Sequence, residues 1–207
     1  MPDDQDARRK YAGHSRDYDR TETDIVAPMR RAAITKLALK PGQTVLDIGC
    51  GTGLSFPLLE EAVGPKGLIV GIDQSPEMLS LARGRVAERG WSNVTLIEAP
   101  AAEAQIPIHA DAALFHFTHD IMRTPRALEN VVKHVKPGGR VVAIGIQWAP
   151  WWRLRANLRT WRLARAYTTT FEGLGAPWSH LEVLVSDLRA EPLADGSIYL
   201  ASGTKKP

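Results

Sequence analysis

Short apolar runs alternate with amphipathic segments through the middle of the chain. Five apolar runs of strand length are typical of buried strands, at residues 44–48, 68–72, 94–98, 112–117 and 141–146. Apolar residues recur at helical spacing in segments at 25–39, 55–62, 75–89 and 125–135. This alternation predicts an α/β fold with a parallel sheet and crossover helices.

After residue 146 the pattern changes. Residues 151–165 have helical spacing, and residues 181–188 and 197–202 predict two closing strands around a turn at 194–196. No internal repeat and no second set of alternating elements follows. We therefore expect one domain, residues 1–207.

The composition of the chain excludes several classes of protein. The 207 residues include one cysteine, which excludes an intramolecular disulfide and a CxxC-type metal site, so no metal is expected. The longest apolar runs are shorter than the roughly 20 residues of a membrane-spanning helix, and the start is charged without a signal-peptide core. This predicts a cytoplasmic protein. The oligomeric state stays open.

Three glycines follow the first predicted strand, in the run VLDIGCGTGLS. Gly49, Gly51 and Gly53 precede a helix, where glycine lets a ligand approach the backbone closely. The third glycine comes one residue too early for a dinucleotide-binding loop, which disfavours NAD. Asp73 ends the next strand about 20 residues later, where a carboxylate can accept hydrogen bonds from ribose hydroxyls.

Asp47 and these three glycines resemble the first motif of class I S-adenosylmethionine-dependent methyltransferases, and the KPGGR turn at 136–140 extends the resemblance over most of the chain. The resemblance implies a Rossmann-like fold with a mostly parallel seven-stranded sheet and helices on both faces. It implies S-adenosylmethionine as cofactor and S-adenosylhomocysteine as product. The chain then divides into a leader and N-terminal helix over the site (1–40), a cofactor-binding core (41–146), and a cationic helix with closing strands (147–207).

The resemblance also assigns residues to the cofactor. Asp47 would bind the ammonium group of the cofactor, and Cys50 would pack within the glycine loop. Gln74 and Met78 would flank the adenine, although Met78 suits ordinary helix packing equally well. The leader YAGHSRDYDR is similar to the start of ubiquinone/menaquinone-type and phospholipid-type methyltransferases, which would place Tyr18 over the cofactor and Tyr11 near the acceptor.

One segment departs from the family. Many relatives have Gly-Asp-Ala after the third strand, and the aspartate meets the adenine amino group, but this chain has Ala99-Pro100-Ala101. Either Glu103 replaces that carboxylate, or backbone groups of Ala101 and Ala102 are sufficient to bind the adenine.

The run HFTHDIM follows the fourth predicted strand and supplies polar groups at the carboxyl edge, where open α/β sheets bind ligands. His116 and His119 are candidate general bases, since an unperturbed histidine titrates near neutrality, or they are structural histidines. His116 would also border the cofactor. Phe117 and Thr118 would contact the acceptor, and Asp120 lies at the same edge.

Five arginines and no acidic residue occur between residues 147 and 171. Apolar residues in 151–165 share one helical face, and Arg155, Arg159 and Arg162 lie on another. The helix either covers the sheet, or binds an anionic lipid surface at the inner face of the membrane, or binds phosphate. If this helix covers the acceptor, the residues in contact with the acceptor would be Trp151, Arg155 and Tyr167.

These observations favour a methyltransferase that acts on a small-molecule acceptor. The alternatives are a phospholipid headgroup N-methyltransferase of the phosphatidylethanolamine type at the membrane surface, and a catalytically silent cofactor-binding scaffold. Nucleic acid is disfavoured as a partner, because the net charge is only +3 and no nucleic-acid-binding module is attached.

Overall fold

The computed structural model describes residues 26–207. The predicted contacts of Tyr11 and Tyr18 therefore lie outside the described residues. The helices are α2 (Val26–Leu37), α3 (Phe56–Val63), α4 (Pro76–Arg89), α5 (His119–Met122), α6 (Pro125–Val132) and α7 (Leu154–Tyr167), with a short 3-10 turn η1 (Ala194–Gly196). The strands are β1 (Thr44–Ile48), β2 (Leu68–Asp73), β3 (Val94–Glu98), β4 (Ala110–His116), β5 (Val135–Ile146), β6 (Val185–Leu193) and β7 (Ile198–Lys205).

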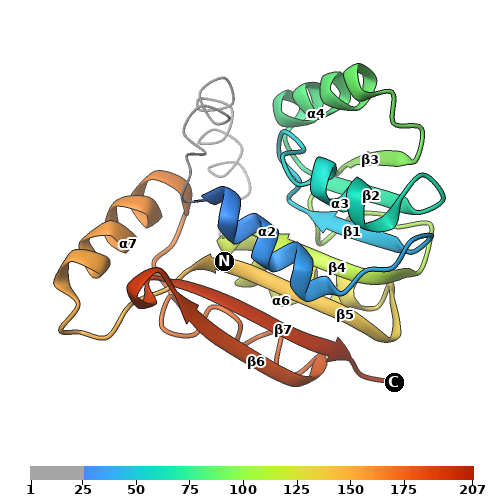
Figure 1. The fold of residues 1–207 in the computed structure, drawn as a ribbon. Coiled ribbons are helices and arrows are strands. Elements are labelled where there is room, and N and C mark those ends of the chain that lie inside the picture. The colour runs from blue at the N-terminus through green and yellow to red at the C-terminus, as the bar shows by residue number, and fades with distance from the viewer. Residues whose placement is uncertain (1–25) are drawn as a thin grey trace.

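The strands form one seven-stranded sheet in the order β3-β2-β1-β4-β5-β7-β6. The first five strands of this order pair in parallel, and β7 pairs antiparallel with both β5 and β6. The carboxyl ends of β1, β2 and β4 therefore meet at one edge of the sheet (Figure 1). The Rossmann-like fold expected from the sequence is confirmed.

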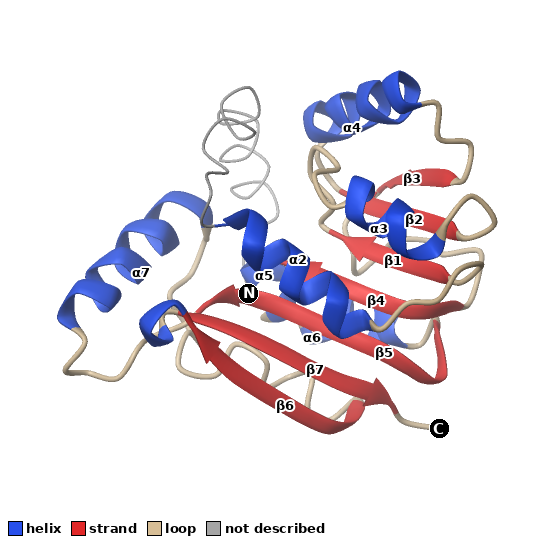
Figure 2. Ribbon diagram, in the orientation of Figure 1, coloured by secondary structure: helices blue, strands red, loops and turns tan. Residues whose placement is uncertain are grey.

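Helices cover both faces of the sheet (Figure 2). One buried cluster joins Leu46, Ile72 and Phe115 to Leu128 of α6. The other joins Val45 and Leu114 to the inward faces of α2, α3 and α4. Because the central strands are buried on both sides, they are mostly apolar at successive positions and not only at alternate ones.

Most predicted elements agree with the structure to within a few residues. The strand expected at 181–188 is wrong in its first half, because Leu181 to Leu184 form a turn in which the Leu184 amide donates to the Leu181 carbonyl at 3.0 Å. Pairing with β7 begins only at Val185 and runs to Leu193. The short α5, which carries the residues after β4, was not expected.

The described residues hold neither a helix that is long and apolar enough to cross a membrane nor a cluster of three or more potential metal ligands.

Phe56 supports the glycine loop from below and provides a stability test. Its side chain is fully buried, and a Cβ added at Gly53 or Gly71 would lie 2.5 Å or 2.9 Å from its ring. Phe56→Ala is expected to lower the free energy of unfolding by about 3–5 kcal/mol, measured by urea unfolding. The exposed Leu81→Ala should cost less than about 1 kcal/mol, and equal losses for both would contradict this account.

Candidate active site

A pocket opens at the carboxyl edge of the sheet, at the ends of β1, β2 and β4. Its lining comes from the glycine loop, the end of β2, the start of α4, the segment after β3 and the segment from β4 into α6. The lining residues are Gly49, Gly51, Ile72, Asp73, Gln74, Met78, Ala99, Pro100, Ala101, Ala102, His116, Phe117, Thr118, Asp120, Ile121, Thr124 and Ala127.

The glycine loop forms one wall of this pocket. The amides of Gly49 and Cys50 donate to the Ile72 carbonyl at 2.7 and 3.1 Å, which fastens the loop to β2. A Cβ at Gly49 would lie 2.5 Å from Cγ2 of Thr118, whereas a Cβ at Gly51 would meet nothing within 4 Å. Gly49 thus allows close packing, and Gly51 presents bare backbone to the pocket. Cys50 and Gly53 lie in the loop but do not line the pocket.

Asp73 stands at the end of β2 with its carboxylate held by backbone amides. Oδ2 accepts from the Gly51 amide at 2.8 Å, and Oδ1 accepts from the Ser75 amide at 2.9 Å. Burial raises the pKa of Asp73, and the bonds from backbone amides oppose that rise. Each carboxylate oxygen retains a lone pair, so the group can still accept hydrogen bonds from two neighbouring hydroxyls.

Ser75 connects the Asp73 turn to α4. Its hydroxyl accepts from the Met78 amide at 3.3 Å and caps the helix. Gln74 and Met78 are thereby brought to the pocket lining beside Asp73.

Asp47 lies in β1 beneath the glycine loop and is not part of the lining. It is 1% exposed, and its Oδ2 has no hydrogen-bond partner among the described residues. Burial raises the pKa of Asp47 to about 7, against the lowering effect of the Arg30 guanidinium. An orphaned, buried acceptor of this kind can take a hydrogen bond from a cationic ligand.

Arg30 was missed by the sequence analysis. It is buried on the inner face of α2 together with Ala33, Ile34 and Leu37. The spacing of these residues was the available signal, because an arginine stood at a position of the apolar stripe. Its charge acts on both Asp47 and His116, one on β1 and the other on β4.

The segment after β3 forms the wall expected to face the adenine. Ala101 and Ala102 line the pocket, but Glu103 is exposed and lies outside the lining. Asn130 of α6 donates through Nδ2 to the carbonyls of Ala101 and Ala104 at 2.8 and 3.0 Å, which fixes the turn. The geometry thus favours the backbone alternative over Glu103. Asn130 had no recognisable sequence signal.

The residues after β4 form the opposite side of the pocket. His116, Phe117 and Thr118 line it, and Phe117 has a left-handed φ of 57°, an unusual conformation for a phenylalanine. Burial, and secondarily the charge of Arg30, lowers the pKa of His116 to about 3. His116 is therefore neutral near pH 7 and a weak base.

His119 lies in α5 and faces away from the lining. Burial lowers its pKa, and the nearby Asp120 carboxylate and Glu172 carbonyl partly oppose this. Asp120, Ile121 and Thr124 line the pocket in its place.

Two of the three residues expected to roof the acceptor lie outside the pocket lining. Trp151 and Arg155 are exposed and take no part in the pocket lining. The side chain of Tyr167 lies outside the described part of the structure, as do Tyr11 and Tyr18.

Comparisons with known proteins agree with this geometry. Residues 39–173 match the family described as Methyltransferase domain. An arsenite methyltransferase from Halobacterium salinarum is 32% identical over 119 residues, 55% of this chain and 30% of the relative. A demethylmenaquinone methyltransferase from Anoxybacillus flavithermus is 31% identical over 133 residues, 61% of this chain and 56% of the relative. A SAM-dependent methyltransferase from Aquifex aeolicus has the same fold, with a TM-score of 0.58 at 22% identity over 85% of this chain and 89% of that one.

Fold and pocket define an α/β protein with a ligand site at the carboxyl edge of its sheet. The family match covers more than half of the residues, and so the chain belongs to the class I S-adenosylmethionine-dependent methyltransferases. The matches span only 30% and 56% of the length of the two curated relatives.

The pKa of Asp47 predicts a pH-dependent affinity for the cofactor product. A carboxyl that titrates near pH 7 is mostly protonated at pH 6 and mostly ionised at pH 8. If the ionised form receives the ligand ammonium, S-adenosylhomocysteine should bind about tenfold more weakly at pH 6 than at pH 8, measured by calorimetry.

Asp47→Asn should bind weakly at both pH values and lose most of this dependence, whereas His116 stays neutral throughout and does not contribute. A wild-type affinity that is equal at pH 6 and pH 8 would exclude this role for Asp47.

Proposed function

We propose that the protein transfers the methyl group of S-adenosylmethionine to a small-molecule acceptor. The observation that carries the proposal is the Asp73 carboxylate, which two backbone amides hold at the pocket beside the bare backbone of Gly51. This arrangement suits a ribose with two hydroxyls next to a chain that passes along the loop.

Other residues at the site would bind the ammonium group and the adenine of the cofactor. Asp47 would receive the ammonium group, and Met78 with the 99–102 segment would enclose the adenine between apolar surfaces. Bound in this way, S-adenosylmethionine supplies an electrophilic methyl group on a sulfonium centre.

The chain itself would contribute positioning and a partly dry site. An acceptor between Phe117 and Ile121 would be held against the methyl group that the cofactor supplies, and these apolar side chains would exclude water from it. Asp120 and neutral His116 are the polar groups near that side, and either can accept a hydrogen bond from the acceptor.

The size of the site supports a small acceptor. The pocket lies within one sheet edge, and its acceptor side is bordered by Phe117, Ile121 and Ala127. The names of these two curated relatives refer to arsenite and to demethylmenaquinone. A labelled methyl donor offered with a metabolite extract would separate this function from a silent scaffold, which would bind the cofactor without product. Phosphatidylethanolamine vesicles in the same assay would test the phospholipid alternative.

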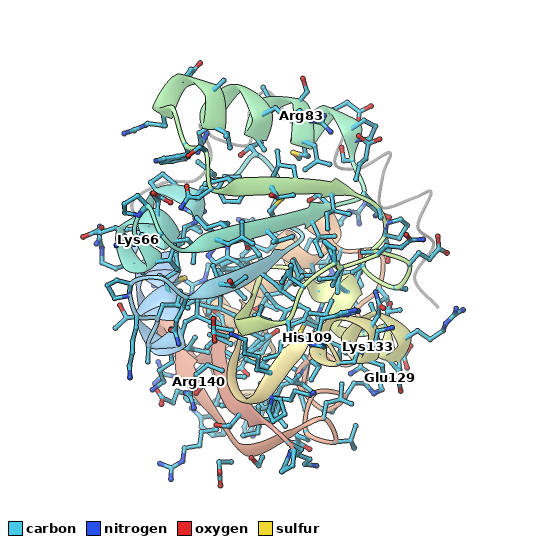
Figure 3. The ribbon with its side chains drawn as sticks, turned by 90° about the vertical axis from the view of Figure 1, so that its right-hand side faces the viewer. Lys66, Arg83, His109, Glu129, Lys133 and Arg140 are labelled. Atoms are coloured by element: carbon cyan, nitrogen blue, oxygen red, sulfur yellow. The ribbon has the colours of Figure 1, made fainter. Side chains whose placement is uncertain are left out.

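Asp73 provides the direct test of the cofactor site. Asp73→Ala removes two charge-assisted hydrogen bonds to the ligand, so S-adenosylhomocysteine should bind at least ~100-fold more weakly by calorimetry. The matched variant Glu129→Ala removes an exposed carboxylate from the opposite edge of the sheet, shown in Figure 3, and should bind as the wild type does. Failure of the wild type to bind would refute the proposed function.

A further inference from the structure

The helix α7 projects from the carboxyl edge of the sheet (Figure 1). Its inward face is made of small residues, since Ala156, Thr160 and Ala164 are its buried positions. The Thr160 hydroxyl donates to the Gln147 carbonyl at 3.0 Å. Leu163 also packs against the core from this side.

The large apolar side chains of this region point outward. We use the term outer face of α7 for five of these side chains, which are 80, 63, 74, 49 and 43% exposed in the order given: Trp151, Trp152, Leu154, Leu158 and Trp161. Leu154, Leu158 and Trp161 recur at helical spacing and form one stripe. Of the alternatives that the sequence left open for this helix, packing of this stripe on the sheet does not agree with the structure. A contiguous apolar group of this kind on a surface marks an interaction site.

Arginines flank the outer face. Arg155 and Arg162 are exposed on either side of Leu158 along the helix, and no described residue forms an ion pair with them. Arg165 lies over the Trp161 ring at 5.5 Å from its centroid. Residues 147–171 contain no acidic side chain, so the charges that this segment itself carries are all positive.

The arginines at the base of the helix have a different role. Arg153 pairs with Asp195 at 2.9 Å, and Arg159 donates to the Ala194 carbonyl and the Ser197 hydroxyl at 2.7 and 2.6 Å. They fasten α7 to η1 and leave Arg155 and Arg162 directed to a partner.

We propose that the outer face of α7 docks the protein on an anionic lipid membrane. Leucine side chains would enter the boundary of the acyl chains, the tryptophans would sit at headgroup level, and the arginines would meet lipid phosphates. The mixture of apolar and cationic side chains on one helix is the chemistry that such a surface recognises.

A second copy of the chain and a nucleic acid fit this face less well. A twofold pairing of outer faces would bring the arginines of both copies together. Leu154 and Leu158 occupy the middle of the stripe and offer no ring on which a base could stack.

Docking through α7 would place the pocket near the lipid. The helix and the pocket lie at the same edge of the sheet, and the Thr169 amide after α7 donates to the Asp120 carboxylate at the pocket, at 3.2 and 3.3 Å. This inference does not depend on the identity of the acceptor.

Vesicle co-sedimentation tests the proposal. The full chain should bind phosphatidylcholine vesicles that contain roughly one-third phosphatidylglycerol, and bind pure phosphatidylcholine at least ~10-fold more weakly. Arg155→Glu with Arg162→Glu should lower the partition coefficient at least ~100-fold, because two attractive charges become repulsive. Leu154→Ser with Leu158→Ser should lower it at least ~10-fold.

Two matched variants serve as controls. Lys66→Glu with Lys133→Glu reverses two exposed charges at the opposite edge of the sheet, which Figure 3 faces, and should leave vesicle binding within about twofold. Val183→Ser replaces a valine that is 70% exposed, similar to Leu154 at 74%. This variant should also leave vesicle binding within about twofold.

Each variant is also titrated with S-adenosylhomocysteine, which reports folding and separates failure of docking from failure of the cofactor site. Absence of wild-type vesicle binding, or equal losses in the control variants, would overturn the proposal. So would a dimer in sedimentation equilibrium that the leucine variant abolishes, or a preference for oligonucleotides over vesicles.

Discussion

The hydrogen bond from the Gly51 amide to the Asp73 carboxylate ties the end of β1 to the end of β2 at 2.8 Å, and the pocket depends on it. Two further amides of the loop donate to the Ile72 carbonyl, so the loop follows the edge of β2 and cannot swing outward. Parallel pairing makes this arrangement available, because neighbouring strands end side by side. Gly71, opposite Asp47 in the register, leaves the space that Cys50 and the Phe56 ring fill below the loop.

The same arrangement buries negative charge. Asp47 and Asp73 each have a pKa raised by burial, and the charge of Asp73 raises that of Asp47 further. Arg30 opposes this for Asp47 from the inner face of α2, while Oδ2 of Asp47 keeps no partner among the described residues. Without a ligand, the buried carboxylates therefore lower the stability of the fold. A ligand that carries positive charge reduces the free-energy cost of burying them. Selectivity for a cationic cofactor follows from the electrostatics of the edge as much as from its shape.

Sequence reasoning succeeded where the determinants are local. The apolar runs predicted β1, β2 and β3 to within a residue, and the glycine spacing with Asp73 located the pocket. The turn expected at 136–140 is wrong, because β5 begins at Val135 and includes these residues. Sequence reasoning missed Arg30 and Asn130, because each acts on a segment distant in the chain: Asn130 bonds the Ala101 carbonyl 29 residues away. It left Glu103 and the backbone of Ala101 and Ala102 as alternatives for the adenine, because sequence proximity does not show which way a side chain points. In the structure Glu103 is exposed and outside the pocket lining, whereas Ala101 and Ala102 line the pocket.

The sequence left the role of α7 open for a different reason. Helical periodicity shows which residues share a face, but it does not decide which face is buried, since that depends on the surface the helix meets. Here Asn157 and Arg159 bond α7 to neighbouring segments, with Asn157 Oδ1 accepting from the Ala149 amide at 2.9 Å and Arg159 donating to the Ala194 carbonyl at 2.7 Å. The face held inward by these bonds consists mainly of Ala156, Thr160 and Ala164, with Leu163 packed beside them. Three tryptophans and two leucines are then left in solvent, at a cost that grows with their apolar area. That cost is recovered only if something outside the described chain covers them.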